Sequence, residues 1–216
     1  MITRGGRHQR QRLVSRKMGA TQVSEGRGEE LLAMYNEVQG RIPYYKCHPF
    51  LITAAGVGRT FGYRPDAIRQ WRDGTIELIE VKRTVDDLRD PDLREKLGII
   101  AEFARLCGWV FRILYLADIS GPGPRTANVE ALYGRRTMKL TSEEATLAAA
   151  ISRKGKPTTW GELRRILCAS DPLHGDALIE CLSARGQLLV DLDERFTTAT
   201  VVQPVMPFAG PCEIDL

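Results

Sequence analysis

Two short runs of this sequence hold residue types that could together bind a metal ion and cleave a phosphodiester. Tyr63-Arg-Pro-Asp66 is followed, after thirteen residues, by Glu80-Val-Lys82. The carboxylates of Asp66 and Glu80 offer the hard oxygen ligands that Mg²⁺ and Mn²⁺ prefer. Lys82 could orient a water molecule whose pKa the metal lowers, while the metal neutralises charge on the phosphate. The pattern indicates metal-dependent hydrolysis; the alternative is a surface hairpin whose Glu and Lys are simply exposed.

For this chemistry the two runs must lie side by side. The sequence predicts strands at 61–71 and 75–83, joined at Asp73-Gly74, which is a strong hairpin signal. A two-residue loop would pair position 66 with 81 and turn Asp66 to the wrong face. A three-residue loop with Gly74 as a left-handed bulge residue would pair 66 with 80. The site therefore predicts the three-residue loop, with Lys82 further along the same face.

The surrounding elements follow from hydrophobic periodicity and from Gly and Pro breaks. Ahead of Ser120-Gly-Pro-Gly-Pro124 we expect a helix at 29–39 and an extended segment at 44–53, followed by the hairpin. A second helix at 93–107 and a buried strand at 110–117 come after the hairpin. Beyond it we expect three helices and two strands, which is the winged-helix pattern, at 142–153, 159–169, 176–185, 187–191 and 195–202. The class is α/β.

Charge is distributed unevenly along the chain. Its 31 Lys+Arg and 27 Asp+Glu give a net charge of +4. Six cations and no acid fall within residues 1–24, and the rest of the chain is slightly acidic; the six are Arg4, Arg7, Arg10, Arg12, Arg16 and Lys17. Such a basic arm suits a polyanion, because each cation on a phosphate releases counterions. We expect a phosphate clamp beside the site, with a solvated, disordered tail as the alternative.

Other classes of protein are disfavoured by composition. The five cysteines are scattered without a CxxC pair, and the three histidines show no metal-ligand spacing, so neither a zinc site nor a disulfide framework is expected. No run approaches the roughly 18 apolar residues of a membrane span. We expect a cytoplasmic protein with reduced thiols and no membrane partner.

The run from Ser24 through Lys82 resembles the nuclease domain of the TnsA endonucleases, which belong to the PD-(D/E)xK superfamily. The residues that carry the resemblance are Ser24-Glu-Gly-Arg-Gly-Glu29-Glu30-Leu-Leu, Tyr45-Lys-Cys-His-Pro49-Phe50, Tyr63-Arg-Pro-Asp66 and Ile79-Glu80-Val81-Lys82-Arg83. TnsA proteins also have a winged-helix domain, which residues 140–202 match. One departure is His48, where the family is expected to have Gln.

The resemblance implies a restriction-endonuclease-like mixed-sheet core followed by a winged-helix domain. The expected organisation is a basic arm (1–24), a nuclease domain (25–119), a linker (120–139), a winged-helix domain (140–203) and an irregular tail (204–216). The implied metal ligands are Asp66, Glu80 and the Val81 carbonyl, with Lys82 as the partner that orients water. The catalytic acid of the first helix maps to Glu29 by motif length, with Glu30 one position away. Further phosphate contacts could come from Arg59, Arg64 and Arg83.

The implied activity is that of an endodeoxyribonuclease dependent on Mg²⁺ or Mn²⁺, which nicks the 5′ strand at transposon ends. It would be one subunit of a heteromeric cut-and-paste transposase, with a DDE-type transposase and an AAA+ ATPase regulator as partners, in the bacterial cytoplasm and associated with the nucleoid when in complex. The alternatives are another PD-(D/E)xK nuclease, of restriction or junction-cleaving type, and a non-catalytic DNA-binding adaptor of a transposition complex.

The winged-helix pattern has few groups suited to reading bases. The expected recognition helix offers Asp176, Glu180, Ser183 and Arg185, and the expected wing is acidic. We therefore expect a module that docks to protein, with DNA reading as the alternative. The tail from Pro204 is either a segment that orders on a partner or a frayed terminus.

Overall fold

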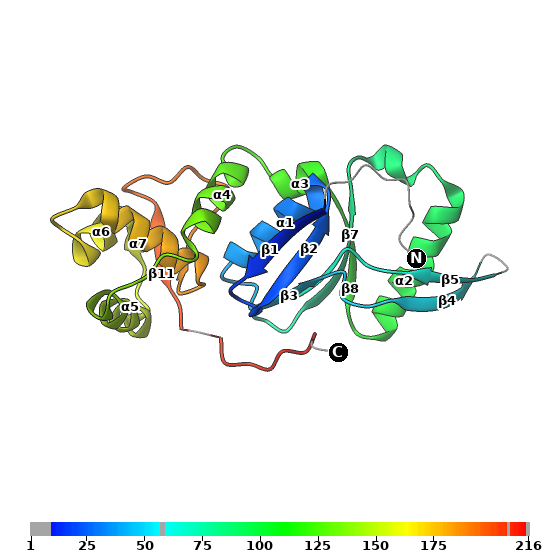
Figure 1. The fold of residues 1–216 in the computed structure, drawn as a ribbon, viewed down its shortest axis with the longest axis horizontal. Helices are drawn as coiled ribbons and strands as arrows, with labels where there is room; N and C mark the ends of the chain where they lie inside the picture. Colours follow the sequence, from blue (N-terminus) through cyan, green and yellow to red (C-terminus); the bar gives the residue numbers. More distant parts are fainter. Residues whose placement is uncertain (1–9, 57–58, 207, 215–216) are drawn as a thin grey trace.

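The computed structural model describes residues 10–56, 59–206 and 208–214, and over these it is a mixed α/β protein (Figure 1). Its centre is a four-stranded sheet in the order β3-β6-β7-β8. The strands are β3 (Tyr44–Cys47), β6 (Ala67–Gln70), β7 (Ile76–Lys82) and β8 (Val110–Tyr115). Neighbouring strands are antiparallel except for β7 and β8, which are parallel and are joined through a 3₁₀ turn (Val85–Leu88) and helix α2 (Pro91–Leu106).

Helices cover both faces of the sheet. Helix α1 (Arg27–Val38) packs Leu31 and Leu32 against Ala67 and Ile79. On the other face, α2 packs Ile100 and Ala104 among the alternate residues of the strands, such as Ile68 and Leu78. β7 is thus apolar on both sides, as a sheet between two helical layers requires. The helices and strands predicted at 29–39, 93–107 and 110–117 are confirmed within a few residues, although β8 is only partly buried.

The hairpin has the predicted three-residue loop. Ala67 pairs with Ile79 and Gln70 with Ile76, a register that carries position 66 opposite position 80. The Trp71 amide donates to the Thr75 carbonyl at 2.8 Å, and Gly74 has a φ of +89°, which favours glycine. The predicted strand 61–71 is not continuous, however. Its first part is β5 (Arg59–Tyr63), which pairs with β4 (Ile52–Gly56) in a separate hairpin that extends from one end of the molecule (Figure 1).

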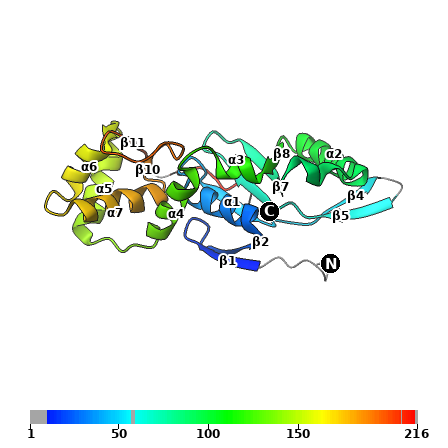
Figure 2. The ribbon, with the colours of Figure 1, turned by 90° about the horizontal axis from the view of Figure 1, so that it is seen from above.

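Residues 10–24, the described part of the predicted basic arm, are structured. Strands β1 (Arg10–Ser15) and β2 (Ala20–Glu25) form an antiparallel hairpin along one side of α1 (Figure 2). The buried Glu37 carboxylate accepts hydrogen bonds from the Ser15 hydroxyl and from the backbone of Arg16 and Lys17 in the turn. These bonds hold the turn on the C-terminal end of α1.

Residues 120–139, predicted as a linker, contain helix α4. After the short helix α3 (Leu116–Ser120), α4 (Arg125–Arg135) buries Val129 and Leu132 in one core with α1 and with Ala184 of the C-terminal half. The breaker cluster at 120–124 ends one helix and precedes another, because its glycines and prolines interrupt the helix only locally.

The C-terminal half has the predicted helices at one end of the molecule (Figure 1). The elements are α5 (Ser142–Lys154), β9 (Thr158–Thr159), α6 (Trp160–Leu167), α7 (Pro172–Ala184), β10 (Leu188–Leu189) and β11 (Val201–Pro204), with a small antiparallel sheet in the order β10-β11-β9. The strand predicted at 195–202 begins only at Val201. Residues 190–200 instead form a loop that packs on α4, where the Arg125 guanidinium pairs with Asp193 and the Asn128 amide donates to the carbonyls of Leu192 and Glu194.

The segment after β11 is irregular, as predicted, and packs back along the central sheet (Figure 1). The Gln70 side chain donates to the Pro211 carbonyl and accepts from the Glu213 amide at 2.9 Å. Ile214 is 1% exposed and packs in the core beneath Ile68 and Leu78. Among the described helices, none has the length and apolar character needed to cross a membrane.

Candidate metal centre

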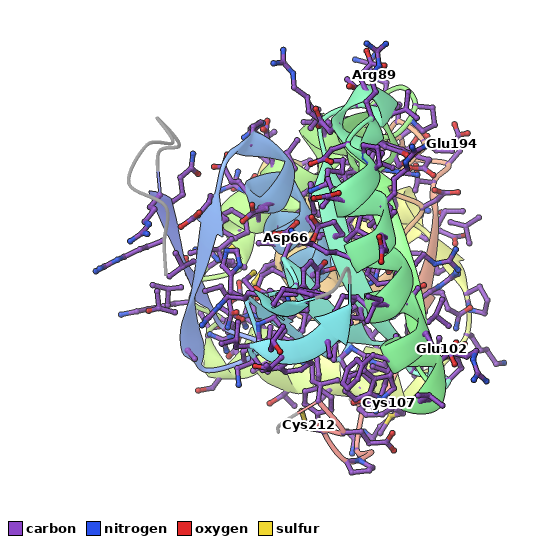
Figure 3. All side chains as sticks on the ribbon, turned by 90° about the vertical axis from the view of Figure 1, so that its right-hand side faces the viewer. Asp66, Arg89, Glu102, Cys107, Glu194 and Cys212 are labelled. Carbon is purple, nitrogen blue, oxygen red and sulfur yellow. The ribbon has the colours of Figure 1, made fainter. Side chains whose placement is uncertain are left out.

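Asp66 lies at the start of β6, one residue before the first residue of that strand that pairs with β7. The alternation of the strand would direct its side chain to the face of Ile68, away from α1. Its Oδ2 atom instead accepts a hydrogen bond of 2.7 Å from the Val81 amide, and this holds the carboxylate at the end of β7. Figure 3 shows Asp66 near the middle of the molecule, between α1 and α2.

Glu29 reaches this point from the first turn of α1. Its Oε2 atom accepts a hydrogen bond of 2.7 Å from the Glu25 amide, which fixes the side chain at the start of the helix. A Cβ atom on Gly28 would lie 2.8 Å from the Val81 side chain, so a glycine is needed for the helix to approach β7 this closely. Glu30 takes another direction and pairs with the Arg27 guanidinium at 2.9 Å. Of the two predicted candidates, Glu29 is the one brought to Asp66.

His48 supplies a third group to the same place. One ligand atom from each of Glu29, His48 and Asp66 can be chosen so that all three lie within 4.8 Å of one another. The Nε2 atom of His48 is 3.1 Å from Glu29 Oε2 but is not aligned for a hydrogen bond, and it is buried without any hydrogen-bond partner in the described chain. Spacing patterns in the sequence do not point to His48, because they detect ligands on a single element and these three residues come from three elements.

Glu80 and Lys82 lie at the end of β7 but make different contacts. The buried Glu80 carboxylate accepts hydrogen bonds from the Tyr63 hydroxyl and from Lys82 Nζ. The register places Glu80 opposite Asp66, as predicted, yet the group of ligand atoms found around Asp66 contains Glu29 and His48 rather than Glu80. The amide of Val81 binds Asp66; a ligand role for its carbonyl stays a prediction.

The electrostatics of this centre are dominated by closely spaced acidic groups. Burial, together with the negative charges of Glu80 and Glu29, raises the pKa of Asp66 to about 8, and the Val81 amide and Lys82 only partly offset this increase. The Glu29 carboxylate raises the pKa of His48 against the opposing effect of burial. Three carboxylates close together at a partly buried sheet end are thus mutually destabilising, and a divalent ion would relieve that repulsion.

Two hollows meet at Glu29 and flank the centre. One, of about 600 Å³, is lined by Gly28, Lys82 and Arg83 among others. The other, of about 840 Å³, is lined by His48, Asp66, Arg64 and Arg10 among others. Each hollow therefore combines an acidic residue of the centre with at least one arginine. Such a hollow could bind the phosphates of a nucleic-acid backbone next to the candidate metal ligands.

The predicted phosphate contacts divide into three groups. Four arginines are exposed and free to reach a polyanion, namely Arg12, Arg16, Arg64 and Arg83. Arg10 is exposed and pairs with Glu25 at 3.0 Å. Arg4 and Arg7 lie outside the described residues, as does the side chain of Arg59.

Lys17 does not belong with these groups, and its prediction as a DNA contact is wrong. Its Nζ atom donates to the carbonyls of Asn36, Gln39 and Ile42 at 2.5–3.0 Å. Burial lowers the pKa of Lys17 to about 7, although the nearby Glu37 opposes that change. A side chain held in this way closes the C-terminal end of α1 and cannot extend to a phosphate.

Neither a protein-family model nor a curated protein matches the sequence. Function is therefore inferred from the residues of the centre and from the elements that hold them.

Proposed function

We propose that the protein is a metal-dependent endodeoxyribonuclease with its active centre at Glu29, Asp66, Glu80 and Lys82. The observation that carries the proposal is the convergence of three elements on Asp66. Helix α1 brings Glu29, the loop after β3 brings His48, and the hairpin register brings the end of β7 opposite. A surface hairpin without a catalytic role would not need a buried Glu80 or a helix packed onto β7 through a glycine.

The architecture supports this assignment. The order α1, β3, β6, β7, α2, β8, with a mixed sheet between two helices, agrees with a restriction-endonuclease-like PD-(D/E)xK core. The order α5, β9, α6, α7, β10, β11 agrees with a winged-helix domain. Together they support the two-domain organisation that the resemblance to TnsA implies.

The residues present fit a divalent metal ion. Glu29 and Asp66 would hold it through carboxylate oxygens, and the unpartnered His48 nitrogen faces the same group of atoms. A bound Mg²⁺ or Mn²⁺ would polarise the phosphate and lower the pKa of the attacking water. The Tyr63 hydroxyl holds Glu80, and Glu80 holds Lys82, so the lysine is positioned at the end of β7 to orient that water. Exposed Arg64 and Arg83 would receive the DNA backbone on either side.

Within this class we propose the TnsA role, nicking of the 5′ strand at transposon ends together with a DDE-type transposase and an AAA+ regulator. The C-terminal half supports dependence on a partner for sequence recognition. Helix α7, the expected recognition helix, has no exposed residue after Leu173, and its Asp176 is bound to Trp160 and Arg164. The loop at the expected wing is packed on α4. Neither element presents a surface for the major groove.

The proposal is tested by strand-specific nicking. Duplexes that carry transposon ends from the protein's own genomic neighbourhood are incubated with Mg²⁺ or Mn²⁺ and the neighbouring transposase. Asp66→Asn should reduce nicking at least 100-fold, whereas Asp73→Asn, at the exposed end of the same hairpin, should leave it unchanged. Equal nicking by the Asp66 variant would remove the proposed centre. Cleavage of unrelated DNA alone would favour a restriction or junction nuclease, and DNA binding without cleavage would favour an adaptor.

A further inference from the structure

The imidazole of His48 has a buried nitrogen atom without a hydrogen-bond partner among the described residues. Among the described residues, buried side-chain atoms without a hydrogen-bond partner are few, and Nε2 of His48 is one of them. A buried imidazole nitrogen that lacks a partner is unfavourable, so such atoms call for an explanation such as a missing ligand. Glu29 Oε2 lies 3.1 Å away and forms an ion pair with the imidazole when the ring is protonated, but the geometry is not that of a hydrogen bond.

We propose that His48 Nε2 is the third protein ligand of the metal centre, and that this ligand makes the centre selective for Mn²⁺ or a similar transition-metal ion over Mg²⁺. The inference rests on the proposed function only in taking the same centre to be a metal site. It concerns which ion is bound, and metal binding can be measured without DNA cleavage.

The distances suit a single ion. Ligand bonds of about 2.1 Å place adjacent ligands of an octahedral ion about 3 Å apart and opposite ligands about 4.2 Å apart. The separation of 3.1 Å between His48 Nε2 and Glu29 Oε2 corresponds to adjacent ligands. All three ligand atoms lie within 4.8 Å, so shifts of a few tenths of an ångström would bring Asp66 into the same coordination sphere.

The backbone holds His48 in this position. Its amide donates to the Asp66 carbonyl at 2.9 Å, which ties two of the three ligands together. Its φ is +46°, and His48 is the only non-glycine residue in the described chain with a positive φ. Such a conformation is unfavourable for most residues and persists where the surroundings impose it, often at functional sites.

The donor set determines the preferred ion. Mg²⁺ strongly prefers oxygen ligands and keeps much of its water, whereas imidazole nitrogen suits Mn²⁺, Fe²⁺, Co²⁺ and Zn²⁺ better. Two carboxylates and one imidazole therefore form a mixed set that still binds Mg²⁺ but binds transition-metal ions more tightly. A glutamine in place of His48 would give an all-oxygen set and remove this difference.

The direct test uses Mn²⁺ as the probe, without DNA. Pulsed electron paramagnetic resonance of the Mn²⁺-loaded full chain should show coupling to one ¹⁴N nucleus. His48→Asn should abolish this coupling; asparagine tolerates a positive φ, so the backbone can be retained. The control is His174→Asn in the C-terminal half, where His174 Nε2 contacts Glu144 at 2.6 Å, and this variant should keep the coupling.

Titration calorimetry gives the second measurement. His48→Asn should weaken Mn²⁺ binding about 10-fold or more and change Mg²⁺ binding by less than about 3-fold. The inference is overturned if the wild-type protein shows no nitrogen coupling, or if a folded His48→Asn protein keeps the wild-type ratio of affinities. Should the variant fail to fold, the coupling in the wild-type and His174→Asn proteins decides.

The two proposals fail in different ways. Nitrogen coupling without any nicking of DNA would contradict the nuclease function and leave the histidine-ligated metal site standing. Nicking supported by Mg²⁺, together with an absence of nitrogen coupling, would leave the nuclease standing and remove His48 from its metal site.

Discussion

At the level of single residues, two adjacent carboxylates at the start of α1 have different surroundings. Glu29 is bound by the Glu25 amide and faces His48 and Asp66, whereas Glu30 pairs with Arg27 at the surface. A rotation of about 100° around the helix axis separates Glu29, which is directed at the end of the sheet, from Glu30, which is directed at Arg27. The apolar stripe of the helix could not distinguish them, because both residues flank it.

The first prediction contrasts these neighbours. Glu29→Gln should lower nicking at least 100-fold and weaken Mn²⁺ binding, because it removes a charged ligand. Glu30→Gln should stay within about 3-fold of the wild-type protein, because it breaks only an exposed ion pair. Strand-specific nicking and calorimetry measure the two effects. The assignment of the helix acid is wrong if Glu30→Gln gives the larger loss.

The predictable part of the site was the part set by local geometry. Asp66, Glu80 and Lys82 follow from the hairpin loop, because Gly74 determines the register over a few residues. The position of His48 depends on a backbone turn after β3 and on the approach of α1, both of which are tertiary. The only signal available in the sequence was that His48 stands where a glutamine is expected in the TnsA endonucleases, which the sequence resembles.

At the level of elements, three neighbouring strands are linked by a buried ion cluster. Glu77 on β7 binds Arg69 on β6 at 2.7 Å and Arg112 on β8 at 2.8 Å. Glu77 and Arg69 are both less than 10% exposed. Burial alone would raise the pKa of Glu77, but the two arginines outweigh it and hold the pKa below its ordinary value. The cluster lies beneath α1 and away from the metal centre, since Arg69 also donates to Asn36.

The second prediction concerns this cluster. Glu77→Gln should reduce the free energy of unfolding by about 3 kcal/mol at neutral pH, because it leaves Arg69 buried without its counter-charge. Because the folded-state pKa of Glu77 is lowered, its stabilisation is complete above the ordinary pKa of a glutamate and decreases as the pH falls below that value.

Urea unfolding of the two proteins between about pH 3 and 7 measures both effects. The difference between wild type and variant should shrink at the acidic end. Glu95→Gln, an exposed residue on α2, is the control and should change stability by less than about 0.5 kcal/mol at every pH. A difference that grows on acidification would contradict this role of Glu77.

The β1–β2 hairpin was missed by sequence reasoning for a physical reason. The inward face of the β1–β2 hairpin is largely polar: Ser15, Gln22 and Ser24 are buried with Leu13. Such a hairpin lacks the alternation of apolar residues that predicts strands, because its buried groups are satisfied by Glu37 and by the Cys47 amide. The helices of the C-terminal half have apolar faces and were therefore predicted within a few residues.

At the level of the whole molecule, segments distant in the sequence complete the same core. The loop at 190–200 buries Leu192 beside Leu13, Met34 and Val129. The C-terminal segment buries Ile214 beneath the central sheet. These contacts join the two halves along α1, α4 and α7, so the boundary drawn from composition at 120–139 separates segments that share a core.

The third prediction tests the contact of the C-terminal segment. Ile214→Ala should reduce the free energy of unfolding by about 2 kcal/mol, because a fully buried side chain is truncated near a chain end where the site can partly collapse. Met206→Ala, at a residue that is 57% exposed in the same segment, should change it by less than about 0.5 kcal/mol. Denaturant unfolding measures both. Equal effects of the two variants would mean that the segment does not pack on the sheet in solution.

The return of Ile214 to the sheet also constrains the order of events during synthesis. The core under Ile68 and Leu78 and the core around Met34 both need residues from beyond position 190. While the chain is still being translated, the sheet that carries Asp66 would therefore be incompletely covered, even though all four of its strands have left the ribosome by then. The proposed metal centre would reach its final packing only after residues up to Ile214 have emerged.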